Sequence, residues 1–367
     1  MYWRLILFFV IIIGDSCVDR IDFNSPDAAS QLVVEGLITD EPGPYFVKLT
    51  RTRKTLDFSA TKTVSAIKVV IFDNVGNSEV LTETYPGFFS TKANGIRGII
   101  GREYYVRIET RDGKIYESTP EKIMPAGSID NLYSTFEEFQ PLTGGPRYQF
   151  KIFMDTQGDP QGENLFRWKF NAAYRVVTNP ELHTEPAGQG RIPAPRACSG
   201  FIFTNKDGLQ QIGPCNCCTC WANIVDTKPI VSSNLVVSDG KFKGIEMGTV
   251  PVEYWTFFDK VLVEVTQLSI SKIATDYWKT IRNQKDGSAS LFQPSIGKAV
   301  SNVYQINGPE EVHGLFYAAG VTKKTLFLEV KDIPLGPSIL PPPPPIIPES
   351  CLTVFPLATS QMPAGWR

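Results

Sequence analysis

The sequence predicts an all-β protein, in which an N-terminal immunoglobulin-like β-sandwich is followed by a larger β-rich domain that carries one helix. Three observations predict this class. The 367-residue chain contains 29 Gly, 28 Pro and 11% aromatic residues, a composition that suits strands and turns. Short runs of β-branched and aromatic residues recur between turn residues. Only one stretch repeats its apolar residues at helical spacing.

The predicted sandwich spans residues 31–122. Its first two strand-like runs, Leu32 to Ile38 and Tyr45 to Thr50, are separated by a Pro/Gly turn that is typical of a hairpin. Asp112 and Gly113 mark a further tight hairpin turn. About six or seven short strands in roughly 95 residues are typical of an immunoglobulin-like fold. The remaining strand-like runs are 66–74, 78–85, 87–91 and 104–118.

The second predicted domain spans residues 129–333. Residues 271–285 predict a helix, because Ile273, Tyr277, Trp278 and Ile281 recur at helical spacing. Trp168 and Trp278 are expected to be buried anchors rather than ligand platforms. The strands expected here are 148–156, 163–177, 200–205, 233–238, 260–270 and 324–332.

The last segment, residues 334–367, is rich in proline. Five consecutive prolines at 341–345 favour an extended polyproline II conformation. We therefore expect a semi-rigid strap rather than a further domain.

The N-terminus predicts export. Arg4 precedes an apolar run from Leu5 to Ile13, which is well short of the roughly 20 residues that cross a bilayer as a helix. Residues 1–16 therefore predict a secretory signal peptide. Cys17 follows the small residues directly, as in the bacterial lipobox, so we expect it to be acylated, with residues 17–30 forming a lipid anchor and tether. The alternative is an ordinary signal peptide followed by a structural cysteine.

Six other cysteines remain, and four of them lie within the segment CNCCTC. In an oxidising compartment an even number of cysteines favours disulfides. Adjacent cysteines pair only with strain, so the cluster is expected to bond outward. We expect at least one bridge that closes the loop from Cys198, worth on the order of 3 kcal/mol for a loop of about 20 residues, and consider a second that pins the C-terminal tail. The candidate disulfide cysteines are Cys198, Cys215, Cys217, Cys218, Cys220 and Cys351.

Two alternatives for the cluster remain open. Four thiolates could hold Cu(I) or Zn(II), although zinc sites usually use two separated CxxC-like pairs. The chain has only two histidines, His183 and His313, which gives little support to a mixed site. Partly free thiols are the other alternative. We predict neither a metal nor a cofactor.

Searches for other chemistry predict no catalytic residue. The net charge is −2 and the sequence pI is near 5.9, so there is no basic field for nucleic acid. Serine-hydrolase, zinc-protease and phosphate-loop motifs are absent from the sequence.

Two acidic groups have alternative interpretations. Asp155, Asp159 and Glu163 could supply oxygen ligands to calcium, but their spacing is not that of an EF-hand, and a solvated loop is favoured. Glu310 and Glu311 could act as paired carboxylates in glycoside chemistry. Adjacent residues in an extended segment point to opposite faces, so a turn or cap before a strand that starts at Leu315 is favoured.

Several segments in order resemble the Bacteroidota outer-membrane lipoproteins catalogued as domain of unknown function 4249. They are LVVEGLITDEPGPYFVKLTR, LFRWKF, the dipeptide CW at 220–221, QLSISKIATDYWKTIRNQKDGSASLFQPS and NGPEEVHGLFYAAGVTKKTLFLEV. The family is often encoded beside TonB-dependent receptors and has no assigned activity.

The resemblance implies a protein anchored to the outer membrane by lipid, on its cell-surface or periplasmic face. We expect a non-catalytic accessory that captures ligand for, or gates, a TonB-dependent outer-membrane receptor. The alternative is an extracellular hydrolase, or a metal- or redox-binding protein, that uses the Cys215–Cys220 cluster.

Overall fold

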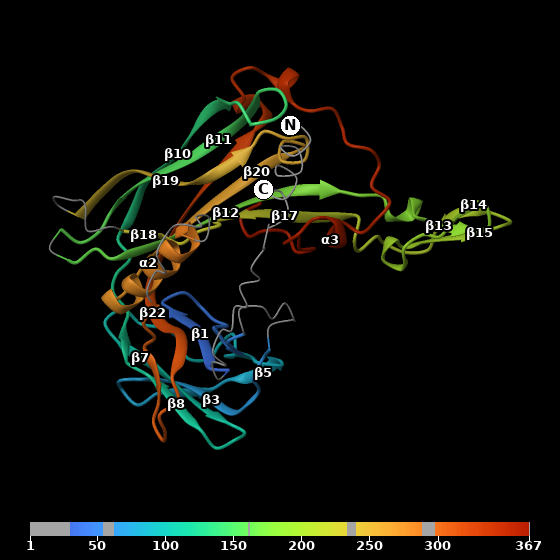
Figure 1. The fold of residues 1–367 in the computed structure, drawn as a ribbon. Helices are drawn as coiled ribbons and strands as arrows, with labels where there is room; N and C mark the ends of the chain where they lie inside the picture. Colours follow the sequence, from blue (N-terminus) through green and yellow to red (C-terminus); the bar gives the residue numbers. More distant parts are fainter. Residues whose placement is uncertain (1–29, 54–61, 161, 233–239, 288–297, 367) are drawn as a thin grey trace, which may run out of the picture.

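The computed structural model describes residues 30–53, 62–160, 162–232, 240–287 and 298–366. Within these ranges the chain is mostly β-strand, which confirms the all-β class. Two β-sandwiches share one continuous nine-stranded sheet, and an arm of two hairpins extends from the second sandwich (Figure 1). The predicted signal peptide, Cys17 and the predicted strand at 233–238 lie outside the described residues.

The first sandwich encloses a core between two sheets. Strands β1 (Leu32–Thr39) and β2 (Phe46–Arg51) belong to the shared sheet, and β3 (Ala66–Asp73), β7 (Glu103–Thr110) and β8 (Ile115–Ser118) belong to the sheet that faces it. Alternate side chains of each strand point inward and are fully buried. The shorter strands are β4 (Ser78–Val80), β5 (Thr82–Tyr85), β6 (Phe88–Ser90), β9 (Glu121–Lys122) and β21 (Val303–Gln305).

One long strand joins the two sandwiches. The first half of β22 (Val312–Glu329) pairs in parallel with β1, and its second half pairs antiparallel with β20 (Lys260–Ser269). Gly314 permits the close approach to β1, since its φ is 93° and a Cβ there would lie 1.9 Å from the carbonyl oxygen of Val34.

This strand changes the domain division that the sequence suggests. Both β21 and the first half of β22 complete the sandwich predicted for residues 31–122, although they come from the range assigned to the second domain, 129–333. Parallel pairing joins segments far apart in the chain, and local residue patterns carry no signal for it.

The second sandwich packs the rest of the shared sheet against a three-stranded sheet. The shared sheet contributes β12 (Phe166–Val177), β20, β22 and the short strands β17 (Thr219–Val225) and β18 (Ile230–Val231). Trp168 is 2% exposed in the core, and its indole N–H donates to Oε1 of Gln267 at 2.6 Å. The prediction of a buried anchor at Trp168 is thus confirmed. The facing strands are β10 (Ser128–Phe139), β11 (Arg147–Gln157) and β19 (Lys241–Pro251).

Helix α2 (Lys272–Gly287) confirms the predicted helix and lies against the outer face of the shared sheet (Figure 1). Its buried residues are Ala274 and Thr275, while Ile273 is 42% exposed. The helix therefore contacts the sheet through a face rotated away from Ile273. Trp278 is half-buried there, beneath the guanidinium of Arg167, which lies 3.5 Å from its ring centroid.

The arm consists of two hairpins between β12 and β17. The first pairs β13 (Thr184–Ala187) with β14 (Gly190–Pro193), and the second pairs β15 (Phe201–Thr204) with β16 (Gly208–Gln211). Short 3-10 turns, Pro180–Leu182 and Ala197–Ser199, precede the two hairpins. The predicted strand at 200–205 corresponds to β15.

The C-terminal segment runs back along the second sandwich to the base of the arm (Figure 1). Two 3-10 turns, Val330–Asp332 and Pro337–Ile339, precede the proline tract, and the short helix α3 (Cys351–Val354) follows it.

Candidate functional site

The six cysteines form three bonded pairs at the base of the arm: Cys198–Cys217, Cys215–Cys218 and Cys220–Cys351. Cys198 bonds into the cluster and Cys351 pins the tail, as the predicted outward bonding requires. The remaining bridge departs from that prediction, because Cys215 and Cys218 pair inside the cluster, where their separation of three residues places the Cα atoms 5.7 Å apart without the strain of an adjacent pair. The first bridge closes 19 residues and the last closes 131. Closing these loops lowers the conformational entropy of the unfolded chain, which stabilises the fold by about 3 kcal/mol for the first bridge and about 5 kcal/mol for the last. Sulfurs bonded in this way are not thiolate ligands, so the geometry uses the cluster as covalent staples.

Polar contacts reinforce the attachment of the tail. The guanidinium of Arg196 donates to both carboxylate oxygens of Glu349, at 2.9 and 2.7 Å. His183 places Nδ1 2.8 Å from the same carboxylate. Further along, Trp221 and Thr359 exchange two backbone hydrogen bonds, so the tail adds a β-bridge beside β17. The predicted strap is therefore fastened to the arm at its far end.

The hairpins of the arm expose large apolar side chains. Ile192 on the first hairpin is 53% exposed, and Ile212, just after the second, is 66% exposed. We call the exposed apolar residues of this region the arm patch. Ile202 and Phe203 are adjacent on β15 and point to opposite faces of the hairpin, so the arm carries exposed apolar groups on both faces, which favours a protein-contact surface around it. The arm patch comprises Ile192, Ile202, Phe203, Leu209 and Ile212.

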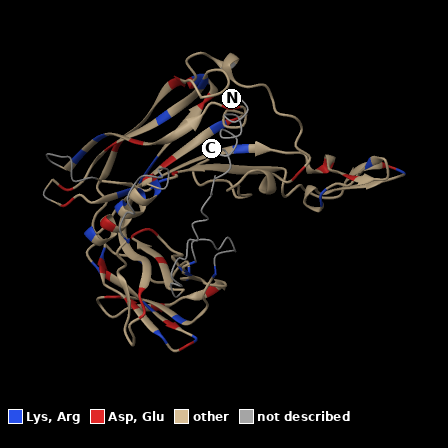
Figure 2. Cartoon of the chain, in the orientation of Figure 1, with Lys and Arg blue, Asp and Glu red and all other residues tan. Residues whose placement is uncertain are grey.

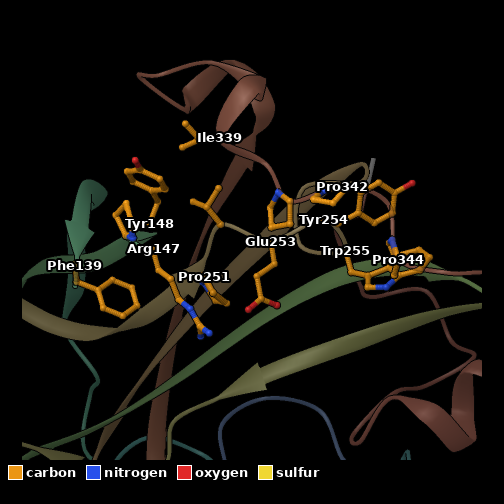
Figure 3. Close-up of a pocket in the computed structure, with 13 residues that line it drawn as sticks. Phe139, Arg147, Tyr148, Pro251, Glu253, Tyr254, Trp255, Ile339, Pro342 and Pro344 are labelled. Carbon is orange, nitrogen blue, oxygen red and sulfur yellow. The ribbon is translucent and has the colours of Figure 1, made fainter. Parts of the chain in front are cut away.

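A groove of about 440 Å³ lies beneath the proline tract (Figure 3). Tyr148, Tyr254 and Trp255 line it on the sandwich side, with Arg147 and Glu253 as its charged groups. Trp255 is held in place by an edge-on contact with Phe355, at 5.8 Å between centroids. We call this the strap groove, since Ile339, Pro341, Pro342 and Pro344 close its other side.

A second groove crosses the face of the shared sheet that carries α2. It consists of three adjoining cavities of about 330, 360 and 390 Å³. The first two share Leu37, Phe46 and Lys169, and the last two share Glu264 and Lys323. We call it the sheet groove.

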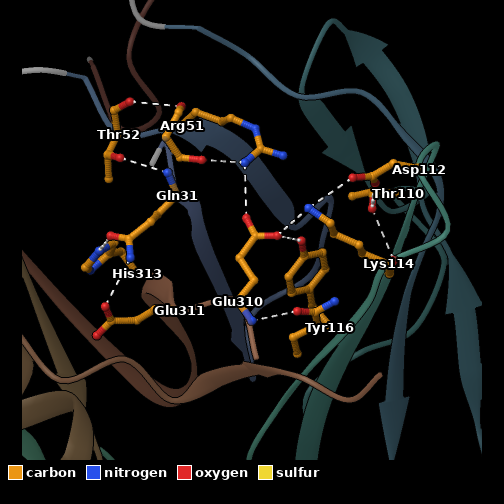
Figure 4. Close-up of polar contacts among 12 residues, drawn as sticks. Gln31, Arg51, Thr52, Thr110, Asp112, Lys114, Tyr116, Glu310, Glu311 and His313 are labelled. Carbon is orange, nitrogen blue, oxygen red and sulfur yellow. Dashed lines mark hydrogen bonds and ion pairs between the residues drawn. The ribbon is translucent and has the colours of Figure 1, made fainter. Parts of the chain in front are cut away.

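Glu310 forms a structural network rather than a catalytic pair (Figure 4). Its carboxylate accepts from Arg51 at 3.1 Å, from Lys114 at 2.7 Å and from the hydroxyl of Tyr116 at 2.8 Å. Burial opposes ionisation, but these donors together hold the pKa of Glu310 below its ordinary value. The network fixes the approach to β22, which begins at Val312, three residues before the predicted start at Leu315.

The neighbouring Glu311 points elsewhere. It accepts from Gln31 at 3.0 Å and pairs with Lys298. His313 faces Gln31 through Nε2 at 2.6 Å, whereas His183 lies at the arm. The two histidines thus belong to different parts of the molecule, and neither hydrogen-bonds to a Ser, Thr or Cys side chain among the described residues.

The suggested calcium ligands are not brought together. Asp155 accepts from the backbone N–H of Gly244 at 2.8 Å and from Asn131 at 3.2 Å. Those hydrogen bonds, the first above all, lower the pKa of Asp155. Across the described ranges, no group of three or more His, Cys, Asp or Glu residues could hold a metal ion. Asp159 and Glu163 therefore do not form such a site with Asp155.

Sequence reasoning missed the sheet groove. A signal was available in β12, where Arg167, Lys169 and Asn171 alternate with core residues and so must face outward together. Both signs of charge are interspersed over the two sandwiches (Figure 2), so the overall charge gives no indication of the groove.

The fold and these surfaces define a class: an all-β protein of two sandwiches with a shared sheet, bearing a disulfide-stapled arm. The chain belongs to the family described as Domain of unknown function (DUF4249), whose model matches residues 18–325. The matched range includes the first sandwich, the arm, α2 and the second sandwich up to residue 325 of β22. No curated protein and no solved structure gives a significant match. Within the described residues, no helix has the length and apolar character needed to cross a membrane.

Proposed function

We propose that the protein is an outer-membrane lipoprotein, acylated at Cys17, that serves a TonB-dependent receptor as a non-catalytic accessory in ligand capture or gating. The observation that carries the proposal is the arm patch. Its apolar side chains extend from the second sandwich on two hairpins, and disulfides fix the base of the second.

The disulfides at the base of the arm favour this interpretation for a physical reason. Binding by a flexible loop loses conformational entropy, whereas a segment already held in place loses less. The bridge between Cys198 and Cys217 closes the whole segment that carries the second hairpin, β15 and β16. The fixed base therefore supports a contact surface for a rigid partner such as a receptor.

The test is recovery of the receptor from native membranes. We expect the tagged wild-type protein to co-purify with a TonB-dependent receptor identified by mass spectrometry. The double variant Ile202→Asp, Phe203→Asp should lose most of it, because charges replace apolar contacts. Ile67→Asp is the matched control, since Ile67 is 62% exposed on the first sandwich.

The proposal fails if the wild-type protein recovers no such receptor even after chemical cross-linking in the membranes, or if the arm variant and the control recover it equally. Circular dichroism and thermal melting must show that both variants retain the wild-type fold. Mass spectrometry of the mature N-terminus tests the anchor separately. The expected result is a diacyl- or triacyl-modified Cys17, and the Cys17→Ala chain should no longer sediment with membranes.

A further inference from the structure

The floor of the sheet groove is a row of polar residues across three strands. Lys169 on β12 lies opposite Thr266 on β20, which in turn lies opposite Lys323 on β22. Residues paired in this way share one face of a sheet. All three line the same cavity, with Leu37 and Phe46 beside them.

Lys169 differs from the two cations near it, Lys323 and Arg167. Lys323 is paired with Glu41 at 2.7 Å, and Arg167 stacks on Trp278 and donates to the hydroxyl of Tyr317 at 2.8 Å. Lys169 is half-buried, and it has no hydrogen bond or ion pair to any residue that the structure describes. An ammonium held partly out of water without an anionic partner is unfavourable, and a bound anion would correct this.

The charges that face Lys169 are mixed. Arg167 and Lys323 act on it as like charges, and Asp226 as an opposite charge. Burial, more than either neighbouring cation, lowers the pKa of Lys169. Glu264 lies on the adjacent row, opposite Asn171, and has no ion pair within the described ranges. It would repel an anion from that part of the floor and direct it toward Lys169.

The walls of the groove are apolar and aromatic at the α2 end and mostly polar at the tail end. Tyr277 and Trp278 of α2 form one end with Leu315 and Tyr317, next to Phe46 and Leu37. The C-terminal tail forms the other end, where Met362 and Pro363 lie beside the polar residues Asn223, Glu264 and Gln361. A ligand with its acidic group on Lys169 therefore has an apolar body that lies at the α2 end.

We infer that the sheet groove binds an organic anion whose aromatic or apolar body lies at the α2 end and whose acidic group is seated on the Lys169 ammonium. The inference deepens the ligand-capture form of the proposed function, on which its biological meaning rests. The binding itself needs only this chain and no receptor.

The test uses two dyes that differ chiefly in charge: 8-anilinonaphthalene-1-sulfonate and the uncharged N-phenyl-1-naphthylamine. Fluorescence titrations use the full chain carrying Cys17→Ala, so that no detergent is present. We expect Lys169→Met to weaken binding of the sulfonate about tenfold, the loss of one charge-assisted contact. Binding of the neutral dye should change less than about twofold, and Lys169→Arg should retain sulfonate binding.

Two controls locate the effect. Lys68→Met removes an equal charge from the first sandwich, and Arg147→Met removes the cation of the strap groove. Both should leave sulfonate binding at the wild-type level. The inference is overturned if the wild type does not bind the sulfonate, if Lys169→Met binds it as tightly as the wild type, or if Arg147→Met is the variant that loses it. Loss of receptor recovery with dye binding intact would refute only the receptor partnership.

Discussion

Glu121 makes the stability of this protein depend on pH in a direction opposite to that of most carboxylates. The residue lies on β9, is 2% exposed, and faces Ser271 before α2 and Asn302 before β21. Burial raises its pKa from 4.5 to about 7, and hydrogen bonding from Ser271 and Asn302 opposes this only in part. Its Oε2 has no hydrogen-bond partner among the described residues.

The direction in which stability changes with pH follows from proton linkage. Between pH 4.5 and 7 the folded state keeps the Glu121 proton while the unfolded state has lost it, so raising the pH favours unfolding. Below this window both states are protonated, and above it both are ionised. A difference of 7 − 4.5 in pKa, at about 1.4 kcal/mol per unit, corresponds to a loss of about 3 kcal/mol of stability.

The assay is denaturant unfolding with disulfides intact, for the wild type and Glu121→Gln, at intervals from pH 4.5 to 8. The variant removes this titration and leaves the others, so the difference between the two isolates Glu121. We expect the wild type to lose about 3 kcal/mol relative to the variant over that range. A difference that stays constant with pH, or a carboxyl NMR titration with its midpoint near 4.5, would refute the reasoning.

Three further predictions concern the staples and the Glu310 network. Replacing both Cys220 and Cys351 by Ala should lower the free energy of unfolding by about 5 kcal/mol and expose the tail to protease. Removing the Cys215–Cys218 bridge should lower the free energy of unfolding by only about 2 kcal/mol, because its loop is short. Equal losses would contradict the loop-length argument. Thiol titration of the unreduced protein should find no reactive thiol among the six paired cysteines, and several reactive thiols or bound metal would instead support the redox or metal alternative. Glu310→Gln should destabilise the protein by about 2 kcal/mol in thermal and denaturant melts, because three donors lose a charged acceptor; the exposed Glu311→Gln is the matched control and should change stability little.

Much of the fold was predictable because local patterns report local structure. Alternation of apolar residues predicts strands such as β7 and β12, and helical spacing predicts α2. Spacing alone does not show which residues of the helix are buried, and Ile273 is 42% exposed, because the buried arc of a helix depends on the sheet beneath it. The extra strands of the first sandwich could not be predicted, because β1 and β22 are 280 residues apart where Leu32 pairs with Val312.

In the candidate site, too, local features of the sequence were predictable and long-range contacts were not. The cysteines were predictable as a group, because their parity and crowding are visible in the sequence, and the tail bridge was a considered alternative. The importance of Lys169 was not predictable. Alternation along β12 shows which way its side chain faces, but only the tertiary structure shows that, among the described residues, Arg167 and Lys323 have partners and Lys169 does not.

The length of β22 has a mechanical consequence. A linker between two domains lets them swing, whereas here one unbroken backbone is bonded sideways to neighbours in both bodies. Bending between the two sandwiches would require breaking the backbone hydrogen bonds of β22 to β1 or to β20. A force applied to the arm is therefore transmitted through the shared sheet to the first sandwich, with no flexible linker to absorb it.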